Sequence, residues 1–342
     1  MKKIIFIFFY SLFFLSQLYA QSGLKSPIIK GLSFVAPPKP FETNPFIPVK
    51  NVNADWIAVI PYAFTRAGEP IVHYDHFNKN GKWWGEGRQG IEETIQQAQL
   101  HGLKIMLKPQ VWCGRGWIGS LEFENKTDWE KWEKSYEDYI LPFAELAEQK
   151  CIEILCIGTE IKQSAIHRPF FWNHLIHKIR SRYSGMITYA ANWDEYNQIK
   201  FWSKLDYVGI DAYFPLSEKT TPEVLDLMNP LEQVLTGIEK FSKQHKKKIL
   251  FTEYGYLSVD GCAGKTWELE SNLSSLKYNP TAQANAIQTL LECCSKKDFW
   301  AGGFIWKWYP ETHTMKRGLE KDHTPQGKLA EEVLKICYGK MR

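Results

Sequence analysis

The sequence predicts an α/β fold, a single-domain (β/α)8 TIM barrel, on three observations. Eight short apolar runs alternate with amphipathic helical segments, an order typical of parallel βαβ units. The chain has 342 residues, and about 250 residues suffice for a closed barrel of eight such units. No Gly-rich phosphate-binding sequence follows any of the runs, which disfavours the alternative fold, a doubly wound open sheet.

From the third predicted strand onward, each apolar run ends in polar or aromatic side chains. The run "CIEILCIGTE" ends in Thr159 and Glu160, and "ILFTEYGY" places Thr252 and Glu253 after three apolar residues. An ionised carboxylate is costly to remove from water unless it is paired or hydrogen-bonded. The two Glu residues therefore require a structural or a functional reason. The predicted strands span residues 31–37, 55–64, 103–112, 151–160, 186–193, 205–214, 249–256 and 301–309.

Helical patterns separate most of these strands. A long one, over residues 127–149, opens with the sequence Thr127, Asp128, Trp129, Glu130. This is the order of a capping box, in which a Thr caps the helix and a Glu three residues later bonds back to it. The interval 194–204 is short, and its helical pattern is weak. The predicted helices span residues 90–101, 127–149, 169–183, 222–245, 281–296 and 326–337.

The N-terminal segment has the composition of a secretory signal. Lys2 and Lys3 precede an apolar run from Ile4 to about Leu18, and Ala20 is a small residue suited to cleavage, which is the order of such signals. The run is shorter than the roughly 20 apolar residues of a membrane-spanning helix. We expect residues 1–20 to be removed, residues 21–342 to form the barrel, and the mature protein to be secreted or periplasmic without membrane attachment. The alternative is a retained N-terminal anchor.

The net charge and the aromatic content of the chain indicate which kinds of ligand the protein binds. The formal net charge is +4, and the Lys and Arg residues are scattered, which disfavours a nucleic-acid surface. The 14 Trp and 16 Tyr residues suit either a core or the sugar sites of a secreted protein. The loop sequence from His73 to His76 has no clear third ligand, so we expect no metal. We expect no cofactor either, and a monomer that acts on a polysaccharide or an oligosaccharide.

Glu160 and Glu253 are the candidate catalytic residues. In a barrel of this kind the active site lies at the C-terminal ends of the strands, and these residues end the fourth and seventh predicted strands. Glycoside hydrolysis needs such a pair, one carboxylic acid to protonate the leaving oxygen and one carboxylate to attack or to activate water. Their environments must differ so that one of them stays protonated near neutral pH. For either Glu taken alone, the simpler interpretation is that it lies at a strand end exposed to solvent and has no catalytic role.

Other polar side chains at the strand ends are candidates for sugar binding. Lys108, Asn192 and Asp211 end the third, fifth and sixth predicted strands, where they are placed to bond sugar hydroxyl groups. Asp211 has the alternative of pairing within the barrel wall. Tyr213 is placed to donate a hydrogen bond to Glu253 and so to hold it ionised; its alternative is an ordinary aromatic residue at a strand end.

Several aromatic residues near the same ends suit stacking on a pyranose ring. Trp306 and Trp308 lie at the end of the eighth apolar run, and we expect only one of them to point inward. Trp112 ends the third run and is a further candidate platform. Packing under a loop is the alternative for Trp112, and it applies equally to the other candidate platforms, Trp83, Trp84 and Trp117.

These stretches together resemble glycoside hydrolase family 113, the β-mannanase family of the clan A retaining glycoside hydrolases. By that resemblance Glu160 is the acid/base, Glu253 is the nucleophile and Trp306 is the inward-facing Trp. The activity it implies is hydrolysis of β-1,4-mannosidic bonds with retention of the anomeric configuration. The matching stretches lie within residues 31–310 and are "GLSFV", "DWIAVIPYAF", "GLKIMLKPQVW", "IGTEI", "YVGIDAYFP", "FTEYGY" and "GGFIWKW".

One position departs from the wider clan. Many members carry Asn just before the acid/base, where it bonds the sugar 2-hydroxyl, whereas this chain has Thr159. The axial 2-hydroxyl of mannose suits a different contact, but Thr159 does not settle the substrate. Two alternatives to a mannanase therefore stay open. One is another clan A glycosidase, such as a glucanase or an exo-acting mannosidase whose long loops close one end of the groove, and the other is a non-catalytic sugar-binding barrel.

Overall fold

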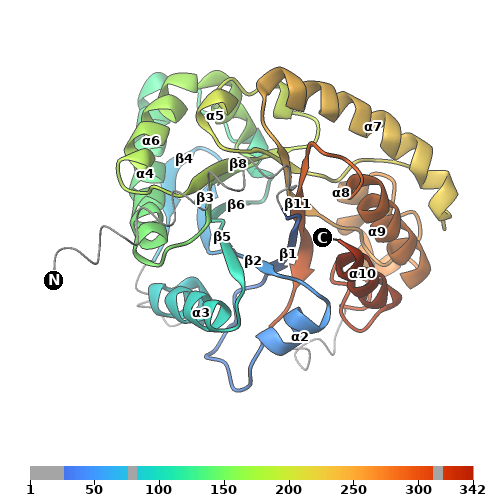
Figure 1. The fold of residues 1–342 in the computed structure, drawn as a ribbon. Coiled ribbons are helices and arrows are strands. Elements are labelled where there is room, and N and C mark those ends of the chain that lie inside the picture. The colour runs from blue at the N-terminus through green and yellow to red at the C-terminus, as the bar shows by residue number, and fades with distance from the viewer. Residues whose placement is uncertain (1–26, 76–82, 311–318, 342) are drawn as a thin grey trace, which may run out of the picture.

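The computed structural model describes residues 27–75, 83–310 and 319–341. Eight parallel strands close into a barrel in which β1 pairs with both β2 and β11, so the predicted fold class is confirmed (Figure 1). The predicted signal at residues 1–20 lies outside the described residues. In order around the barrel the strands are β1 (Ile29–Phe34), β2 (Trp56–Val59), β5 (Lys104–Leu107), β7 (Ile154–Thr159), β8 (Met186–Asn192), β9 (Val208–Asp211), β10 (Ile249–Tyr254) and β11 (Trp300–Trp308).

Helices surround the barrel, with α4 and α6 on one side and α9 and α10 on the opposite side (Figure 1). All six predicted helices are present with ends shifted by a few residues: α3 (Arg88–Leu100), α4 (Lys126–Gln149), α6 (Pro169–Arg180), α7 (Val224–His245), α9 (Pro280–Cys294) and α10 (Leu329–Lys340). The weak pattern at 194–204 forms two 3₁₀ turns, η3 (Tyr196–Gln198) and η4 (Trp202–Lys204). Elements that the sequence pattern did not predict are α2 (Phe46–Asn51), α5 (Lys162–His167), α8 (Thr266–Glu270), and the 3₁₀ turns η1 (Trp84–Glu86), η2 (Ile118–Ser120) and η5 (Leu273–Ser275).

The start of α4 differs from the prediction. Its N-cap is Asn125, whose side-chain oxygen accepts a hydrogen bond from the Asp128 backbone N–H at 2.9 Å. The predicted capping box placed the cap at Thr127, which instead lies inside the first turn. Asn and Thr both cap helices, and Asn ranks ahead of Thr in this position. The earlier Asn therefore takes the cap, and the helix begins at Lys126.

Two of the predicted strands are each divided in two. The runs at 55–64 and 103–112 form β2 and β5 in the barrel, followed by β3 (Tyr62–Arg66) and β6 (Gln110–Gly114) in a separate small sheet with β4 (Glu69–His73). The breaks fall at Pro61 and Pro109. Proline has no N–H to donate to a sheet ladder, so it ends the pairing within the barrel.

The small sheet lies at the mouth of the barrel and is held by α4. Ser135 of α4 bonds both backbone groups of Val72 on β4, accepting from its N–H at 2.9 Å and donating to its carbonyl at 3.3 Å. β3 and β6 run parallel, with Tyr62 opposite Gln110 and Phe64 opposite Trp112. This sheet extends the wall of the barrel beyond the ends of β2 and β5.

The core has two layers, one inside the barrel and one between the barrel and its helices. Phe304 and Trp306 of β11 belong to the inner layer, whereas Trp308 is fully buried in the outer one. Trp306 shares the face of Phe304, as the two-residue alternation of a strand requires. Trp308 departs from that alternation, because the pairing of β11 with β1 shifts register between Ile305 and Trp308. Only one of the two Trp residues therefore faces the interior, and it is Trp306.

Candidate active site

Glu160 lies where the chain leaves β7. Its φ is 53°, in the left-handed region that non-glycine residues seldom adopt, at a cost of about 1–3 kcal/mol. Two backbone bonds hold this turn: the Glu160 N–H donates to Ala190 on β8 at 2.8 Å, and the Lys162 N–H donates to the Glu160 carbonyl at 2.9 Å. The turn ends the strand at the mouth of the barrel and begins α5 two residues later.

The Glu160 carboxyl group is held by Trp117 from the loop before α4. The indole Nε1–H of Trp117 donates to Glu160 Oε2 at 2.8 Å. Gly119 permits this position of the ring, because a Cβ at residue 119 would lie 2.4 Å from it. Burial raises the pKa of Glu160 to about 7, the charge of Glu253 acts in the same direction, and the bond from Trp117 opposes both. Glu160 is therefore poised to exchange a proton near neutral pH.

Glu253 on β10 is 7% exposed and accepts three hydrogen bonds. Lys108 Nζ and Gln110 Nε2 both donate to Oε1, the latter at 2.8 Å, and the Tyr213 hydroxyl donates to Oε2 at 2.8 Å. A cation and two neutral donors compensate for the removal of this carboxylate from water. The hydrogen bond expected from Tyr213 is confirmed.

Lys108 and Asp211 form a buried charge cluster with Glu253. Both side chains are 0% exposed, and Lys108 Nζ lies 3.6 Å from Asp211 Oδ1, which also accepts from Thr252 Oγ1 at 2.7 Å. Burial alone would lower the pKa of Lys108, but the charges of Asp211 and Glu253 outweigh it and raise that pKa. Burial first, and then the charge of Glu253, raises the pKa of Asp211.

The structure therefore corrects the expectation that Lys108 and Asp211 bond sugar hydroxyl groups. Side chains with no exposed surface cannot reach a ligand in the groove, and their polar atoms face Glu253, Thr252 and each other. The alternative that we weighed for Asp211, pairing within the barrel wall, is the observed one. Lys108 donates a hydrogen bond to Glu253, the candidate nucleophile, from the buried interior of the barrel.

The remaining predicted residues lie around the same mouth. Asn192, half-buried at the end of β8, accepts a hydrogen bond from the Trp193 backbone N–H through Oδ1 at 2.8 Å. Thr159 is buried beside Glu160, and Trp306 is half-buried. Trp112 is 61% exposed and contacts Phe64 with ring centroids 5.6 Å apart. Its exposed ring is available to a ligand.

Two residues of the centre were not among the predicted site residues. Gln110 lies two positions after Lys108, a spacing that directs both side chains to one face of an extended chain, and this spacing could have indicated it. Glu195 follows β8 and is fully buried; its Oε1 accepts from the Asn192 N–H at 3.2 Å, and its Oε2 has no hydrogen-bond partner among the described residues. Burial raises the pKa of Glu195 to about 7. No sequence pattern marked it.

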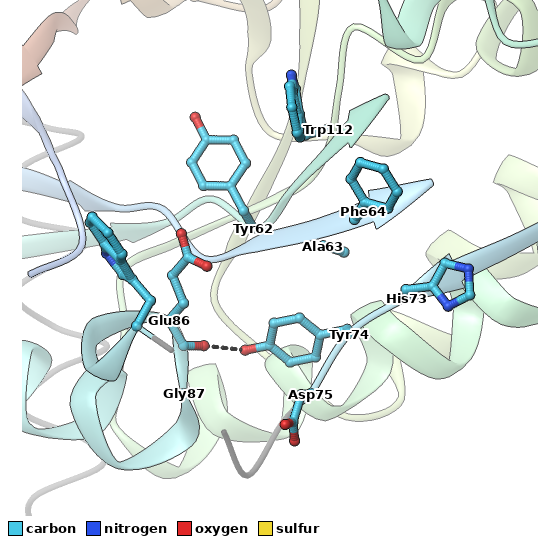
Figure 2. Close-up of a pocket in the computed structure, with 10 residues that line it drawn as sticks. Tyr62, Ala63, Phe64, His73, Tyr74, Asp75, Glu86, Gly87 and Trp112 are labelled. Atoms are coloured by element: carbon cyan, nitrogen blue, oxygen red, sulfur yellow. Dashed lines mark hydrogen bonds between the residues drawn. The ribbon is translucent and has the colours of Figure 1, made fainter. Parts of the chain in front are cut away.

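A cavity of about 590 Å³ opens beside the small sheet. Figure 2 shows Tyr62, Phe64 and Trp112 on one side of it and Tyr74 on the other, with the Glu86 carboxyl group directed toward Tyr62. Burial raises the pKa of Glu86 to about 7. The full lining is Tyr62, Ala63, Phe64, His73, Tyr74, Asp75, Trp83, Glu86, Gly87 and Trp112.

No set of three or more His, Cys, Asp or Glu side chains is arranged for a metal ion within the described ranges. In the His73–His76 sequence, His73 Nε2 lies 3.1 Å from Glu69 Oε1, and His76 lies outside those ranges. Among the same residues, no helix combines the length and the apolar composition needed to cross a membrane.

The fold and the two carboxyl groups together define a class of protein. A closed (β/α)8 barrel whose fourth and seventh strands end in an acid with a raised pKa and in a carboxylate held by three donors is the arrangement of a glycoside hydrolase. The particular family is shown by sequence: residues 48–328 match Glycoside Hydrolase Family 113. The chain belongs to that family, as the resemblance of its motifs indicated. No curated protein sequence matches it significantly.

Solved structures agree with the fold. A family 113 β-1,4-mannanase solved as a complex is 23% identical, with a TM-score of 0.77 over 92% of this chain and 100% of that chain. A β-mannanase of the same family from Alicyclobacillus acidocaldarius is 22% identical, with a TM-score of 0.74 over 92% and 98% of the two chains. A β-glucuronidase from Ruminococcus gnavus is 14% identical, with a TM-score of 0.62 over 92% of this chain and 50% of that one.

Proposed function

We propose that this glycoside hydrolase cleaves β-1,4-mannosidic bonds of mannan or mannooligosaccharides with retention of the anomeric configuration. Family membership and the likeness to two mannanases support the substrate. The observation that carries the mechanism is the difference between the two carboxyl groups. Glu253 is held by a cation and two further donors, whereas burial raises the pKa of Glu160 to about 7. One is suited to attack and the other to donate a proton.

In the first step, a Glu253 oxygen attacks the anomeric carbon while Glu160 gives its proton to the leaving glycosidic oxygen. The C–O bond to the leaving group breaks, and a glycosyl ester on Glu253 forms. The negative charge of Glu253 is thereby neutralised. Because that charge is one cause of the raised pKa of Glu160, the pKa of Glu160 falls at this point, and the residue becomes a competent base.

In the second step, Glu160 takes a proton from water, and the water oxygen attacks the anomeric carbon. The ester bond breaks, Glu253 regains its charge, and the pKa of Glu160 rises again with the proton in place. Lys108, Gln110 and Tyr213 keep Glu253 in one position through both steps. This mechanism requires the two carboxyl groups to lie about 5–5.5 Å apart, and an inverting mechanism would need roughly 6.5–9.5 Å.

Azide rescue tests the two roles separately. We expect Glu253→Ala to abolish turnover and added azide to give a glycosyl azide of inverted configuration. Glu160→Ala should still form the covalent intermediate from substrates with a good leaving group, and azide should then give a product of retained configuration. The opposite stereochemistry for the two variants would exclude this assignment.

Substrate comparison tests the remaining alternatives. The wild-type protein, incubated with mannan, glucomannan and cellulose oligosaccharides, should release products from the first two. Release from cellulose oligosaccharides alone would favour a glucanase, and single mannose units released from chain ends would favour an exo-acting mannosidase. Binding without any product would favour a non-catalytic barrel.

We also propose that the protein is secreted or periplasmic, on the basis of the order of charge, apolar run and small residue at its N-terminus, and that it is a monomer. The mature protein should then begin near Gln21. Intact-mass measurement of the protein from its native host checks this, and retention of residues 1–20 would contradict it. Sedimentation equilibrium of the same sample measures the oligomeric state.

A further inference from the structure

Tyr213, one of the three donors to Glu253, lies on a segment without regular structure. Residues 212–219 follow β9 and belong to no helix or strand. The Tyr213 hydroxyl donates to Glu253 Oε2 at 2.8 Å. Burial first, and then the charge of Glu253, raises the pKa of Tyr213, so the hydroxyl keeps its proton and stays a donor. On such a segment, side-chain contacts must set the direction of the ring.

His323 supplies a contact of this kind. Its ring meets the Tyr213 ring in a T-shaped arrangement, with centroids 6.0 Å apart and an interplanar angle of 68°, a geometry that aromatic pairs favour. His323 is 4% exposed and follows β11, so it comes from a different strand of the barrel than Tyr213. The contact therefore joins the chain after β9 to the chain after β11.

The His323 ring is held in place although one of its nitrogens has no hydrogen bond. Nε2 lies 2.9 Å from Glu270 Oε1 on α8. The hydrogen bond from His323 lowers the pKa of Glu270, and a carboxylate is an acceptor only, so Nε2 carries a proton. Nδ1 is buried without a partner among the described residues, which costs free energy. A ring kept buried at that cost favours a role for its position.

The backbone beneath this ring is also fixed. Gln283 of α9 is fully buried, and its Nε2 donates to the carbonyls of Tyr256 at 2.8 Å and His323 at 2.9 Å. Lys328 Nζ donates to the Asp322 carbonyl at 2.7 Å. These bonds fasten the segment that carries His323 to the chain that leaves β10. The ring is therefore fixed from its own backbone as well as by Glu270.

We propose that His323 is a positioning residue, whose ring holds the Tyr213 ring in the orientation in which the hydroxyl donates to Glu253. This inference rests on the proposed function and adds a residue that acts through Tyr213. Glu253 regains its negative charge when the glycosyl ester breaks, and a donor already in place stabilises that charge without rearranging. The ring contact performs this role, so another aromatic ring at position 323 should perform it as well.

A double-mutant cycle tests the inference. We expect His323→Ala to lower kcat on mannooligosaccharides by about tenfold, the effect of weakening a hydrogen bond to a charged group. KM should change less than about twofold, because Tyr213 bonds Glu253 and not the sugar. Tyr213→Phe removes the donor and should lower kcat at least as much. In the Tyr213→Phe background, His323→Ala should lower kcat by less than about twofold further, because the hydroxyl that it positions is already gone.

Three further measurements complete the design. His323→Phe keeps a ring against Tyr213 and should keep kcat within about threefold of the wild type. His245→Ala is the matched control: it removes a His ring whose centroid lies 4.2 Å from that of Phe241 at the end of α7, and it should change neither kcat nor KM. A crystal structure of His323→Ala should show the Tyr213 hydroxyl displaced from Glu253. If His323→Ala does not fold, His323→Leu, which fills the space without a ring, takes its place.

Four outcomes would overturn the inference. They are an unchanged kcat for His323→Ala, losses that multiply in the double variant, a kcat for His323→Phe as low as that of His323→Ala, and a Tyr213 hydroxyl that still bonds Glu253 in the variant's crystal structure. If the wild-type protein cleaves a different β-glycan, the proposed substrate fails, and the same cycle is measured on that glycan. If it cleaves none, the proposed function fails, and the crystal structure still tests the position of Tyr213.

Discussion

At the scale of single residues, the centre contains more acidic groups than cations. Asp211, Glu253 and Glu160 lie around one buried cation, Lys108, which contacts the first two. Lys108 therefore favours a charge on Glu253, while Glu160 experiences that charge and holds its proton to a higher pH. The placement of one Lys thus divides the roles of two otherwise identical side chains.

Removing the Lys108 charge should damage both stability and turnover. In Lys108→Met, the carboxyl groups of Glu253 and Asp211 lose the cation that they share, and breaking one side of a buried pair costs about 3–5 kcal/mol. We expect the free energy of unfolding to fall by that order and kcat to fall by at least tenfold. Denaturant unfolding and steady-state kinetics measure the two effects. Lys30→Met, which removes a half-buried partner of Asp55 at 3.5 Å, is the control and should cost less than about 1 kcal/mol.

Removing the Trp117 donor should change the pH dependence of catalysis. The bond from Trp117 Nε1 favours the ionised form of Glu160 and lowers its pKa. In Trp117→Phe that pKa should rise, so the general acid stays protonated to a higher pH. The alkaline limb of the kcat/KM profile should then move upward by about one pH unit. A profile that keeps its alkaline limb, or moves it downward, would show that Glu160 is not the acid.

At the scale of residues, a strand end was enough to locate two side chains in the fold. Glu160 and Glu253 were placed at the mouth of the barrel because each follows an apolar run and a Thr that belong to a barrel strand. The burial of Lys108 was not predicted, because strand position alone does not say whether a side chain faces the groove or the barrel interior below it. Glu86 lies on a single 3₁₀ turn, which has no periodicity to read.

At the scale of elements, the small sheet is the feature that sequence periodicity could not separate from the barrel. Apolar residues occur on both sides of Pro61 and Pro109 in the runs at 55–64 and 103–112, so each run was predicted as one strand. The prolines mark the point where pairing changes from the barrel ladder to the β3–β6 ladder. Because Gln110, which bonds Glu253, and Trp112, which lines the cavity, both follow that change, the small sheet positions the cavity relative to Glu253.

The N-cap of α4 offers a test of an element boundary. Asn125→Ala removes the side-chain acceptor of the Asp128 N–H and should lower the free energy of unfolding by about 1 kcal/mol. Thr127→Ala should have little effect, because Thr127 lies inside the first turn. Equilibrium unfolding in denaturant distinguishes the two variants. A larger loss for Thr127→Ala would restore the capping box that the sequence pattern predicted.

At the scale of the whole molecule, acidic groups with raised pKa values gather at the end of the barrel that carries the site. Burial raises the pKa of Glu160, Glu86 and Glu195 to about 7 in each case. Glu160 and Glu195 follow neighbouring strands of the barrel, β7 and β8, and Glu86 faces the cavity beside Tyr62. Glu160, the proposed catalytic acid, is therefore held in surroundings that disfavour negative charge, and such surroundings lower the stability of the folded protein at neutral pH.

This arrangement predicts that the protein loses stability as the pH rises from about 5 to 8. Each of the three carboxyl groups has a folded-state pKa above its ordinary value of 4.5, so between these values the folded protein binds more protons than the unfolded chain. These groups therefore reduce the free energy of unfolding least below pH 4.5, and their destabilising effect grows as the pH rises through about 7.

Glu195 is fully buried and should account for about 1–3 kcal/mol of this decline in the free energy of unfolding. In Glu195→Gln the unfolding free energy, measured in denaturant at pH 5, 6, 7 and 8, should fall less steeply than in the wild type. Glu145→Gln on the exposed face of α4 should follow the wild-type curve. Parallel curves for Glu195→Gln and the wild type would show that Glu195 does not hold a proton in the folded protein.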